Sequence, residues 1–362
     1  MTAWAQLLPA CLLPPRSKVY SAAPWLNSLA AWLLLASALN NHGWFYDEWI
    51  DAPQLAEITA HIPAATLRRL IVTVFAANLP NLRRDGRKLN TTPRNDPQRE
   101  RFAYNPLANR PVVAMSQGRY LVPSPLLLLR RASPTGIYYA ALDALGPSIG
   151  NDLDAALEHY VGRQLAQASH EALIPEIAYG QPQRRTVDWF MVIGEVVLLI
   201  EVKAPRLTEA ARLGDDEALA HDLERTIGKA RQQIERSAAL MALPPPELTA
   251  AGLPVGLAVC GLIVTLEPYH LVQSGLVDDM LRSTAVPTSV VSIHELEQLV
   301  ALARNGPDLG QQLAQVQQDL ELSTWGTLSA VRHVWPEPVG DNPIVIAAGE
   351  ELAWHPPGPP LD

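Results

Sequence analysis

The stretch that decides the fold is TVDWFMVIGEVVLLIEVKA, residues 186–204. Two apolar runs lie on either side of Gly194 and Glu195. A glycine at the first central position of a two-residue connection is what a type II′ hairpin turn requires. The stretch is therefore predicted to form two antiparallel strands joined by a tight turn.

Charged residues gather on one face of this predicted hairpin. With Ile193 opposite Val196, counting outward places Asp188 opposite Glu201, and Lys203 follows two residues later. Because side chains alternate between the two faces of a strand, all three charged residues project from the same side. Two opposed carboxylates repel each other, and partial burial raises that cost, unless they share a cation. Two carboxylate ligands, with the remaining positions left to water and a substrate phosphate, suit Mg²⁺ or Mn²⁺.

Other side chains can complete such a site. Lys203 would orient a water molecule or balance charge on a phosphate. Glu158, at the edge of the apolar stripe of the helix predicted over residues 152–168, is preferred as a further carboxylate to Glu176, which follows a proline and is expected to face solvent. Gln233 borders the apolar stripe of a later helix, where it either holds a phosphate or water or ends a packing edge. A surface ion-pair cluster is the alternative to a metal site.

The elements around the hairpin follow an α/β order. The helix over 152–168 comes first, and a short strand lies within residues 173–180. A long helix over 215–243 follows the hairpin, and a strand over 254–266 follows that helix. The last strand is almost continuously apolar, which implies cover on both faces of the sheet. This order predicts an α/β domain in which helices pack on a central sheet.

The charged residues and their setting resemble the PD-(D/E)XK nuclease superfamily. Asp188 precedes the hairpin turn, Glu201-Val202-Lys203 follows it, and helices flank both, the second of them containing KARQQI. The likeness covers about residues 150–270. Val187 stands where the family motif has proline. The resemblance implies a restriction-endonuclease-like α/β/α sandwich with a central mixed sheet.

The resemblance also implies roles for individual residues. Asp188 and Glu201 correspond to the metal-binding acids, and Lys203 corresponds to the catalytic lysine. Glu158 corresponds to the helix carboxylate that many members use, also as a metal ligand, and Gln233 to a helix glutamine found in some. We accordingly expect Mg²⁺ or Mn²⁺ as the cofactor.

The expected activity is hydrolysis of phosphodiester bonds by an endonuclease. DNA is the first expectation for the substrate, RNA stays open, and restriction, repair or antiphage defence is the setting that the resemblance implies. The alternative is a catalytically inactive nuclease-like module that binds nucleic acid or scaffolds a protein complex. The intact set of Asp188, Glu201 and Lys203 favours the enzyme.

Three segments are expected along the chain. Residues 1–145 are predicted to form a mainly helical N-terminal domain that selects the substrate or a protein partner, residues 146–305 the nuclease-like domain, and residues 306–362 a C-terminal helical segment with a proline-rich tail. Within the first, residues 83–101 are expected to be a basic loop that contacts phosphates, with a solvated loop as the equal alternative. The residues expected to contact nucleic acid are Arg83, Arg84, Arg87, Lys88, Lys229 and Arg236.

Composition narrows the class of protein. The 362 residues are 48% hydrophobic and 18% charged, a globular composition with room for two domains. The formal net charge of −9 does not exclude nucleic acid, because a local basic surface or a bound cation can overcome a mildly acidic whole. A homodimer stays open.

Cysteine content and hydropathy bear on location. Only Cys11 and Cys260 occur, far apart and outside any CxxC, so neither a disulfide framework nor a thiolate zinc site is indicated and a cytoplasmic location is expected. Residues 28–39, SLAAWLLLASAL, are shorter than the roughly 20 apolar residues of a membrane span. A buried helix is predicted there in preference to a secretion signal, and no membrane partner is expected.

Overall fold

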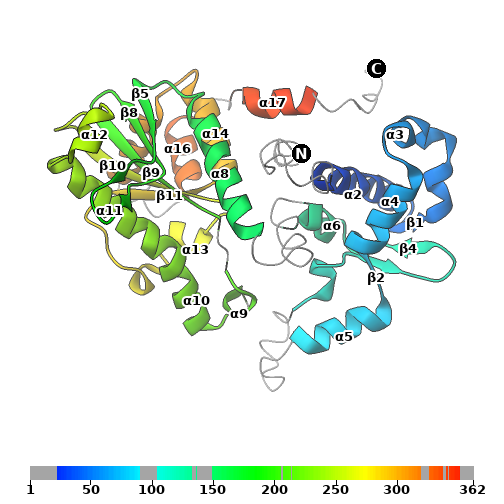
Figure 1. Ribbon diagram of the computed structural model, residues 1–362. Coiled ribbons are helices and arrows are strands. Elements are labelled where there is room, and N and C mark those ends of the chain that lie inside the picture. Colours follow the sequence, from blue (N-terminus) through cyan, green and yellow to red (C-terminus); the bar gives the residue numbers. More distant parts are fainter. Residues whose placement is uncertain are drawn as a thin grey trace. The chain divides into compact units, whose positions relative to one another are not determined.

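A computed structural model describes residues 23–89, 104–132, 136, 149–204, 207–212, 214–318, 326–336, 340 and 342–350. The chain divides into two compact units (Figure 1), one formed by residues 1–152 and 347–362 and the other by residues 153–346. Helices and mixed sheets make up both, so the predicted α/β class is confirmed.

A five-stranded sheet forms the centre of the second unit, in the order β11-β10-β9-β8-β5. β9, β10 and β11 run parallel to one another, whereas β8 is antiparallel to both β9 and β5. The strands are β5 (Ala172–Pro175), β8 (Trp189–Ile193), β9 (Val196–Lys203), β10 (Ala258–Thr265) and β11 (Thr288–Ser292), and a separate two-stranded ribbon joins β6 (Ala178–Tyr179) to β7 (Arg184–Arg185).

The hairpin has the predicted register. Ile193 pairs with Val196, and the pairing continues to Trp189 opposite Ile200. Gly194, at the first turn position, has a φ of +54°, a left-handed value that favours glycine there. Continuing this register by one residue places Asp188 opposite Glu201, just before the start of β8.

Helix α11 (Lys229–Ala242) packs on one face of the sheet. Its buried residues recur at helical spacing and include Ala230 and Ile234, which share one apolar core with Leu199 of β9 and Phe190 of β8. Because Glu201 lies two residues beyond Leu199, its side chain projects from this same face. α10 (Asp216–Leu223) and the π-helical segment η6 (Glu224–Gly228) run directly into α11, as the predicted long helix requires.

Other helices lie against the opposite face. α8 (Ile149–Leu165) approaches so closely that a Cβ added at Gly162 would collide with the indole of Trp189. α14 (Ile293–Ala303) contacts β10 and β11, and α15 (Leu309–Gln318) contacts β9 and β11. The hydroxyl of Tyr160 on α8 donates to Glu297 on α14 at 2.7 Å, which joins the two helices inside the protein. The remaining helices are α9 (Glu209–Arg212), α12 (Pro246–Ala250), α13 (His270–Gln273), η7 (Asp278–Met280), α16 (Thr327–Val334) and α17 (Pro343–Glu350).

The segment after residue 305 does not stand apart from this unit. α15 and α16 pack against β11, and the second unit extends to residue 346. Their apolar side chains, among them Leu309, Leu313 and Val331, are fully buried. The sequence placed a boundary at 305/306 because the pattern of a short helix does not reveal which surface it covers. Residues 351–362 of the predicted tail lie outside the described residues.

The first unit contains a sheet as well as helices, a difference from the mainly helical expectation. Its strands are arranged in the order β1-β4-β3-β2. Each has only three residues, too few for a period-two pattern to be recognised in the sequence. The elements are α2 (Ala23–Asn40), β1 (Trp44–Tyr46), η1 (Asp47–Asp51), η2 (Pro53–Leu55), α3 (Ala56–His61), α4 (Ala64–Leu70), η3 (Ile71–Phe75), β2 (Ala76–Asn78), α5 (Leu79–Leu89), η5 (Pro106–Ala108), β3 (Val112–Ala114), β4 (Arg119–Leu121) and α6 (Pro125–Ala132).

Residues 28–39 lie within α2, as predicted. Leu34 is fully buried in a core that also contains Phe45, Leu67 and Leu128. Among the helices that the structure describes, none has the length and apolar character that a membrane crossing needs.

The start of the expected basic loop is a helix. Arg83, Arg84, Arg87 and Lys88 all lie in α5, so the prediction of a loop is wrong over this part. Leu82 is buried and Gly86 faces the ring of Pro106, which gives the helix an inward side despite its polar composition. Residues 90–101 of that segment lie outside the described residues.

Candidate active site

Glu201 and Asp188 meet at the junction of β8 and β9. The side chain of Glu201 is 0% exposed, although it ends in a carboxylate. Oδ2 of Asp188 accepts a hydrogen bond from the backbone N–H of Val202 at 2.7 Å, so the Asp188 carboxylate is fixed against the neighbouring strand. Side chains directly opposite on antiparallel strands have Cβ atoms about 4.5–5.5 Å apart, and the charge of Asp188 raises the pKa of Glu201, so the two acids interact.

Lys203 neutralises only part of this charge. Its Nζ forms an ion pair with Oε1 of Glu201. Oε2 of Glu201 is buried and has no hydrogen-bond partner among the described residues. A buried carboxylate oxygen without a partner is costly. Oε2 of Glu201 therefore lacks the hydrogen-bond donor or cation that would stabilise it.

The pKa values report the same excess of negative charge. Burial, followed by repulsion from Asp188, raises the pKa of Glu201 to about 8. Burial also raises the pKa of Asp188, against the effect of the Val202 hydrogen bond. On α8, burial and then the charges of Asp188 and Glu176 raise the pKa of Glu158 to about 7. Glu158 therefore lies within electrostatic range of Asp188, and its expected role as a metal ligand stays a prediction.

Glu176 belongs to the same group, contrary to the expectation that it faces solvent. β5 pairs with β8 so that Pro175 lies opposite Trp189, and Glu176 and Asp188 are the residues next to this pair on the two strands. Its side chain is 24% exposed and forms a 2.7 Å ion pair with Arg185. Its charge raises the pKa values of Glu158, Asp188 and Glu201. The pairing of β5 with the hairpin was the signal that could have identified it.

The backbone leading to Asp188 is held from α11. Nε2 of Gln233 donates to the carbonyl of Thr186 at 3.0 Å, and Oγ of Ser237 accepts from the N–H of Val187 at 3.0 Å. Gln233 and Ser237 are one helical turn apart, so one face of α11 holds both polar groups of the peptide that joins Thr186 to Val187. This contact agrees with the packing alternative for Gln233, whose amide nitrogen serves the protein backbone. Ser237, fully buried, was not singled out from the sequence.

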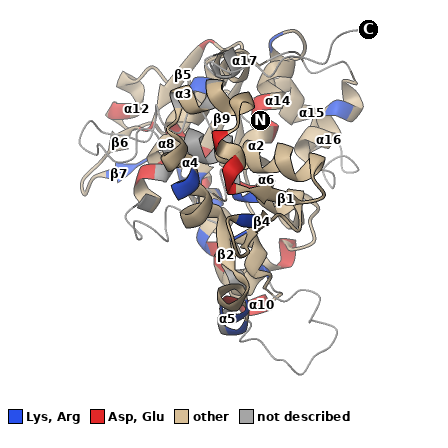
Figure 2. Cartoon of the chain, turned by 90° about the vertical axis from the view of Figure 1, so that its right-hand side faces the viewer, with Lys and Arg blue, Asp and Glu red and all other residues tan. Residues whose placement is uncertain are grey.

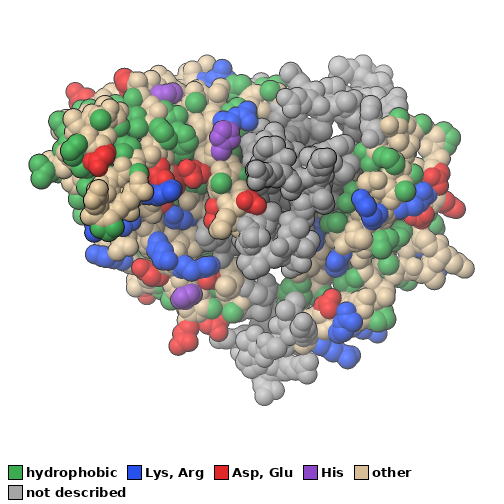
Figure 3. Space-filling view, viewed as in Figure 1, with side chains coloured by type: hydrophobic (Ala, Val, Ile, Leu, Met, Phe, Trp, Pro, Cys, Tyr) green, Lys and Arg blue, Asp and Glu red, His purple; other side chains and the backbone are tan. Residues whose placement is uncertain are grey.

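The residues expected to contact nucleic acid lie on two helices, α5 of the first unit and α11 of the second. Lys229 and Arg236 lie on the outer side of α11. Arg83, Arg84 and Arg87 are exposed on α5. The ribbon of α5 carries Lys and Arg positions in blue in Figure 2, and Lys and Arg side chains gather over this helix in Figure 3. Arg84 also pairs with Asp85 at 3.5 Å.

A metal ion would have few protein ligands in this site. Within the part of the chain that the structure describes, no three His, Cys, Asp or Glu residues form a group that could hold one. Asp188 and Glu201 supply oxygen atoms, and Oε2 of Glu201 is free to bind. Two carboxylates with water and substrate in the other positions are a set that Mg²⁺ accepts. The residues present therefore fit a weakly held divalent cation.

Comparisons with known proteins give little similarity. No family model matches the sequence, and no curated protein matches it. The small subunit (R.BspD6I2) of the heterodimeric restriction endonuclease R.BspD6I is similar at 11% identity and a TM-score of 0.28, over 55% of this chain and 94% of that chain. Protein VC1899 from Vibrio cholerae is similar at 12% identity and a TM-score of 0.22, over 88% of this chain and 54% of that chain. TM-scores of this size do not establish a shared fold.

Proposed function

We propose that the second unit is a metal-dependent endonuclease with a restriction-endonuclease-like α/β/α sandwich. The observation that carries this proposal is the unpartnered, fully buried Oε2 of Glu201 opposite Asp188. A stable fold that places a carboxyl group with an unpartnered oxygen in its interior needs a reason, because apolar residues of similar size would fit a buried strand at lower cost. Binding a divalent cation is such a reason.

Each residue of the site would contribute a separate step. Oε2 of Glu201 and the free oxygen of Asp188 would hold Mg²⁺ or Mn²⁺. When bound, the cation would supply Lewis-acid stabilisation of the phosphate and a water of lowered pKa. Lys203, held beside Glu201 and partly exposed, would donate to a phosphate oxygen or orient the attacking water. Glu158, with a pKa of about 7, can accept or release a proton at neutral pH.

The substrate would be nucleic acid, DNA in the first place. Exposed arginines on α5, together with Lys88, Lys229 and Arg236, would neutralise phosphates in spite of the net charge of −9. If so, the logarithm of the binding constant falls linearly with the logarithm of the salt concentration, with a slope of about −0.9 for each phosphate neutralised in duplex DNA. A cytoplasmic role in restriction, repair or antiphage defence, a protein partner of the first unit and a homodimer are further parts of the proposal.

Cleavage assays test the catalytic part directly. The full chain is incubated with plasmid, linear duplex, single-stranded DNA and RNA in Mg²⁺, Mn²⁺ or EDTA. We expect cleavage only with a divalent cation, loss of cleavage in Asp188→Asn and Glu201→Gln, and a fall of about 100-fold or more in Lys203→Met. Glu195→Gln, which changes an exposed carboxylate in the hairpin turn, serves as the matched control. Cleavage in EDTA, or undiminished cleavage by Glu201→Gln, would refute the assignment.

One observation favours a second candidate, a nuclease-like module that binds nucleic acid without cleaving it. No three potential ligands form a metal-binding group among the described residues, and Lys203 already occupies one oxygen of Glu201. Binding in a gel-shift assay, with no cleavage under any metal condition and no change in Asp188→Asn, would select this candidate.

A further inference from the structure

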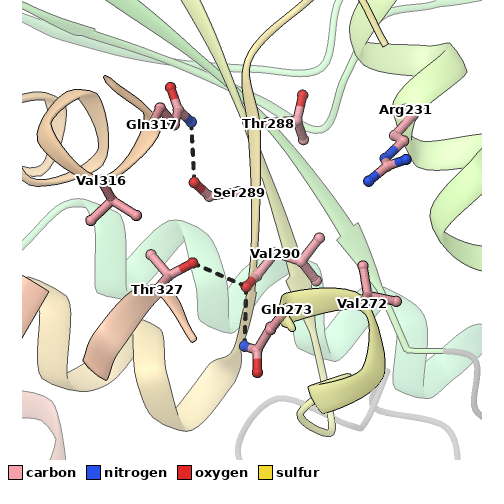
Figure 4. A pocket seen from close by; sticks show the side chains of 9 residues that line it. All are labelled: Arg231, Val272, Gln273, Thr288, Ser289, Val290, Val316, Gln317 and Thr327. Carbon is pink, nitrogen blue, oxygen red and sulfur yellow. Dashed lines mark hydrogen bonds between the residues drawn. The ribbon is translucent and has the colours of Figure 1, made fainter. Parts of the chain in front are cut away.

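The second unit contains a pocket on strand β11, at the edge of the sheet and two strands away from β9. It has a volume of about 100 Å³, whereas one water needs only about 10–15 Å³. There is room for several waters or one small ion. The polar side chains in its wall are Arg231, Gln273, Thr288, Ser289, Gln317 and Thr327 (Figure 4).

Arg231 lines this pocket, and part of its guanidinium has no partner among the described residues. The side chain extends from α11 toward β11 in Figure 4. Nη1 donates to the carbonyl of Arg282 at 3.0 Å, which fixes the plane of the group. Nε is buried and has no hydrogen-bond partner among the described residues, and no interaction of Nη2 is found there either. Nε and Nη2 together form the edge of arginine that binds two oxygens of one anion.

The charge of Arg231 is also uncompensated. In the described parts of the chain, no carboxylate lies within ion-pair distance of it. Glu295 contacts the pocket residue Gln273, but its carboxylate already accepts from the backbone N–H of Ser292 at 2.6 Å and from Nε2 of Gln273 at 3.0 Å. A half-buried cation with two idle donors favours an anionic ligand over a neutral one.

Two acceptors on β11 in the pocket wall, the carbonyl of Val290 and Oγ of Ser289, accept hydrogen bonds from neighbouring side chains. The carbonyl of Val290 accepts from Nε2 of Gln273 at 3.2 Å and from the hydroxyl of Thr327 at 3.4 Å, both drawn in Figure 4. Oγ of Ser289 accepts from Gln317 at 3.1 Å. A ligand that donates hydrogen bonds would find these two acceptors already in use. A ligand that accepts hydrogen bonds could use the unpartnered Nε of Arg231.

We propose that this pocket binds a small oxyanion of the phosphate class through Nε and Nη2 of Arg231. The site is separate from the carboxylates of β8 and β9 and does not depend on their activity. The anion is either free phosphate or the terminal phosphate of a nucleotide, because both present two oxygens to one guanidinium edge. The size of the pocket favours free phosphate.

The binding test uses the full chain in EDTA, so that the carboxylate site contributes nothing through a metal. Sodium phosphate is titrated against sodium chloride of equal ionic strength while the Nε–H resonances of the arginines are followed by NMR. We expect one resonance, absent in Arg231→Gln, to shift and saturate. Calorimetry should show binding about tenfold or more weaker in Arg231→Gln and in Arg231→Lys, which keeps the charge and loses the two-donor edge.

Two comparisons make the outcome decisive. Arg332→Gln, an exposed arginine on α16, should bind phosphate like the wild type. Adenosine monophosphate in place of phosphate separates the two sources, since equal affinity would indicate a terminal phosphate and weaker binding a free anion. If no arginine Nε resonance shifts in the folded wild type, or if Arg231→Lys binds phosphate undiminished, the proposal is overturned, whether or not the protein cleaves nucleic acid.

Discussion

Replacing Glu201 by glutamine should remove part of the dependence of the free energy of unfolding on pH. The side chain is fully buried and its pKa is raised from 4.5 to about 8. The folded protein therefore holds a proton on Glu201 at pH values where the unfolded chain has released it. The contribution of Glu201 to the free energy of unfolding is therefore fully present below pH 4.5 and is lost as the pH rises through 8. Glutamine has nothing to titrate, so this loss disappears in the variant.

The size of the effect follows from the two pKa values. The interval from 4.5 to about 8 corresponds, at about 1.4 kcal/mol per pH unit, to an order of 5 kcal/mol over the whole range. Between pH 6 and pH 9, a range in which the folded protein can be studied, linkage predicts that the free energy of unfolding falls by roughly 3 kcal/mol. That is a large fraction of the free energy of unfolding of an ordinary domain, roughly 5–15 kcal/mol.

Urea denaturation in EDTA at several pH values measures this change. The wild type should lose roughly 3 kcal/mol more than Glu201→Gln between pH 6 and pH 9. Glu195→Gln, an exposed position on the same hairpin, should follow the wild type. The variant can be less stable at every pH, because its amide nitrogen would occupy the place of the unpartnered oxygen, and that offset does not alter the slope. Parallel curves for wild type and Glu201→Gln would refute the view that this carboxylate is buried without compensation.

Further changes test the metal and the packing around it. Mg²⁺ should raise the melting temperature of the wild type more at pH 9 than at pH 6, since it competes with the proton on Glu201, and calorimetry should detect proton release. Gly162→Ala should destabilise the second unit by about 1–3 kcal/mol in urea titrations, because the methyl group meets Trp189. Ser237→Ala should cost about 1–3 kcal/mol by the same measurement, since it leaves the Val187 N–H buried without a partner.

The hairpin could be predicted from sequence because its register is local. A two-residue turn at Gly194 leaves one way to pair the strands, and the charges at Asp188 and Glu201 then have to meet. The amphipathic pattern of α8 likewise placed Glu158 toward the sheet. In both cases the information lies within a few residues of the atoms concerned.

The rest of the site depends on pairings between distant segments. Glu176 joins the acids because β5 pairs with β8, and the stretch between them gives no fixed turn from which to count. A proline before Glu176 suggested an exposed end, whereas an edge strand can accommodate proline within its pairing. In α5, four basic residues among a few apolar ones suggested a loop, and the burial of Leu82 and the contact of Gly86 with Pro106 show that the helix has a packed side.

The same distant contacts explain how an energetically costly site can be held in place. The carboxylate of Asp188 accepts a hydrogen bond from Val202 on β9, while the peptide group between Thr186 and Val187 is hydrogen-bonded to both Gln233 and Ser237 on α11. On the other side, α8 is joined to α14 through Tyr160. Repulsion among the carboxylates would separate a loosely held set of side chains, and three independent attachments prevent this. Activity, if the proposal is correct, should therefore decline in Ser237→Ala even though Ser237 contacts neither metal nor substrate, with the metal concentration needed for half-maximal cleavage rising while Glu195→Gln leaves it unchanged.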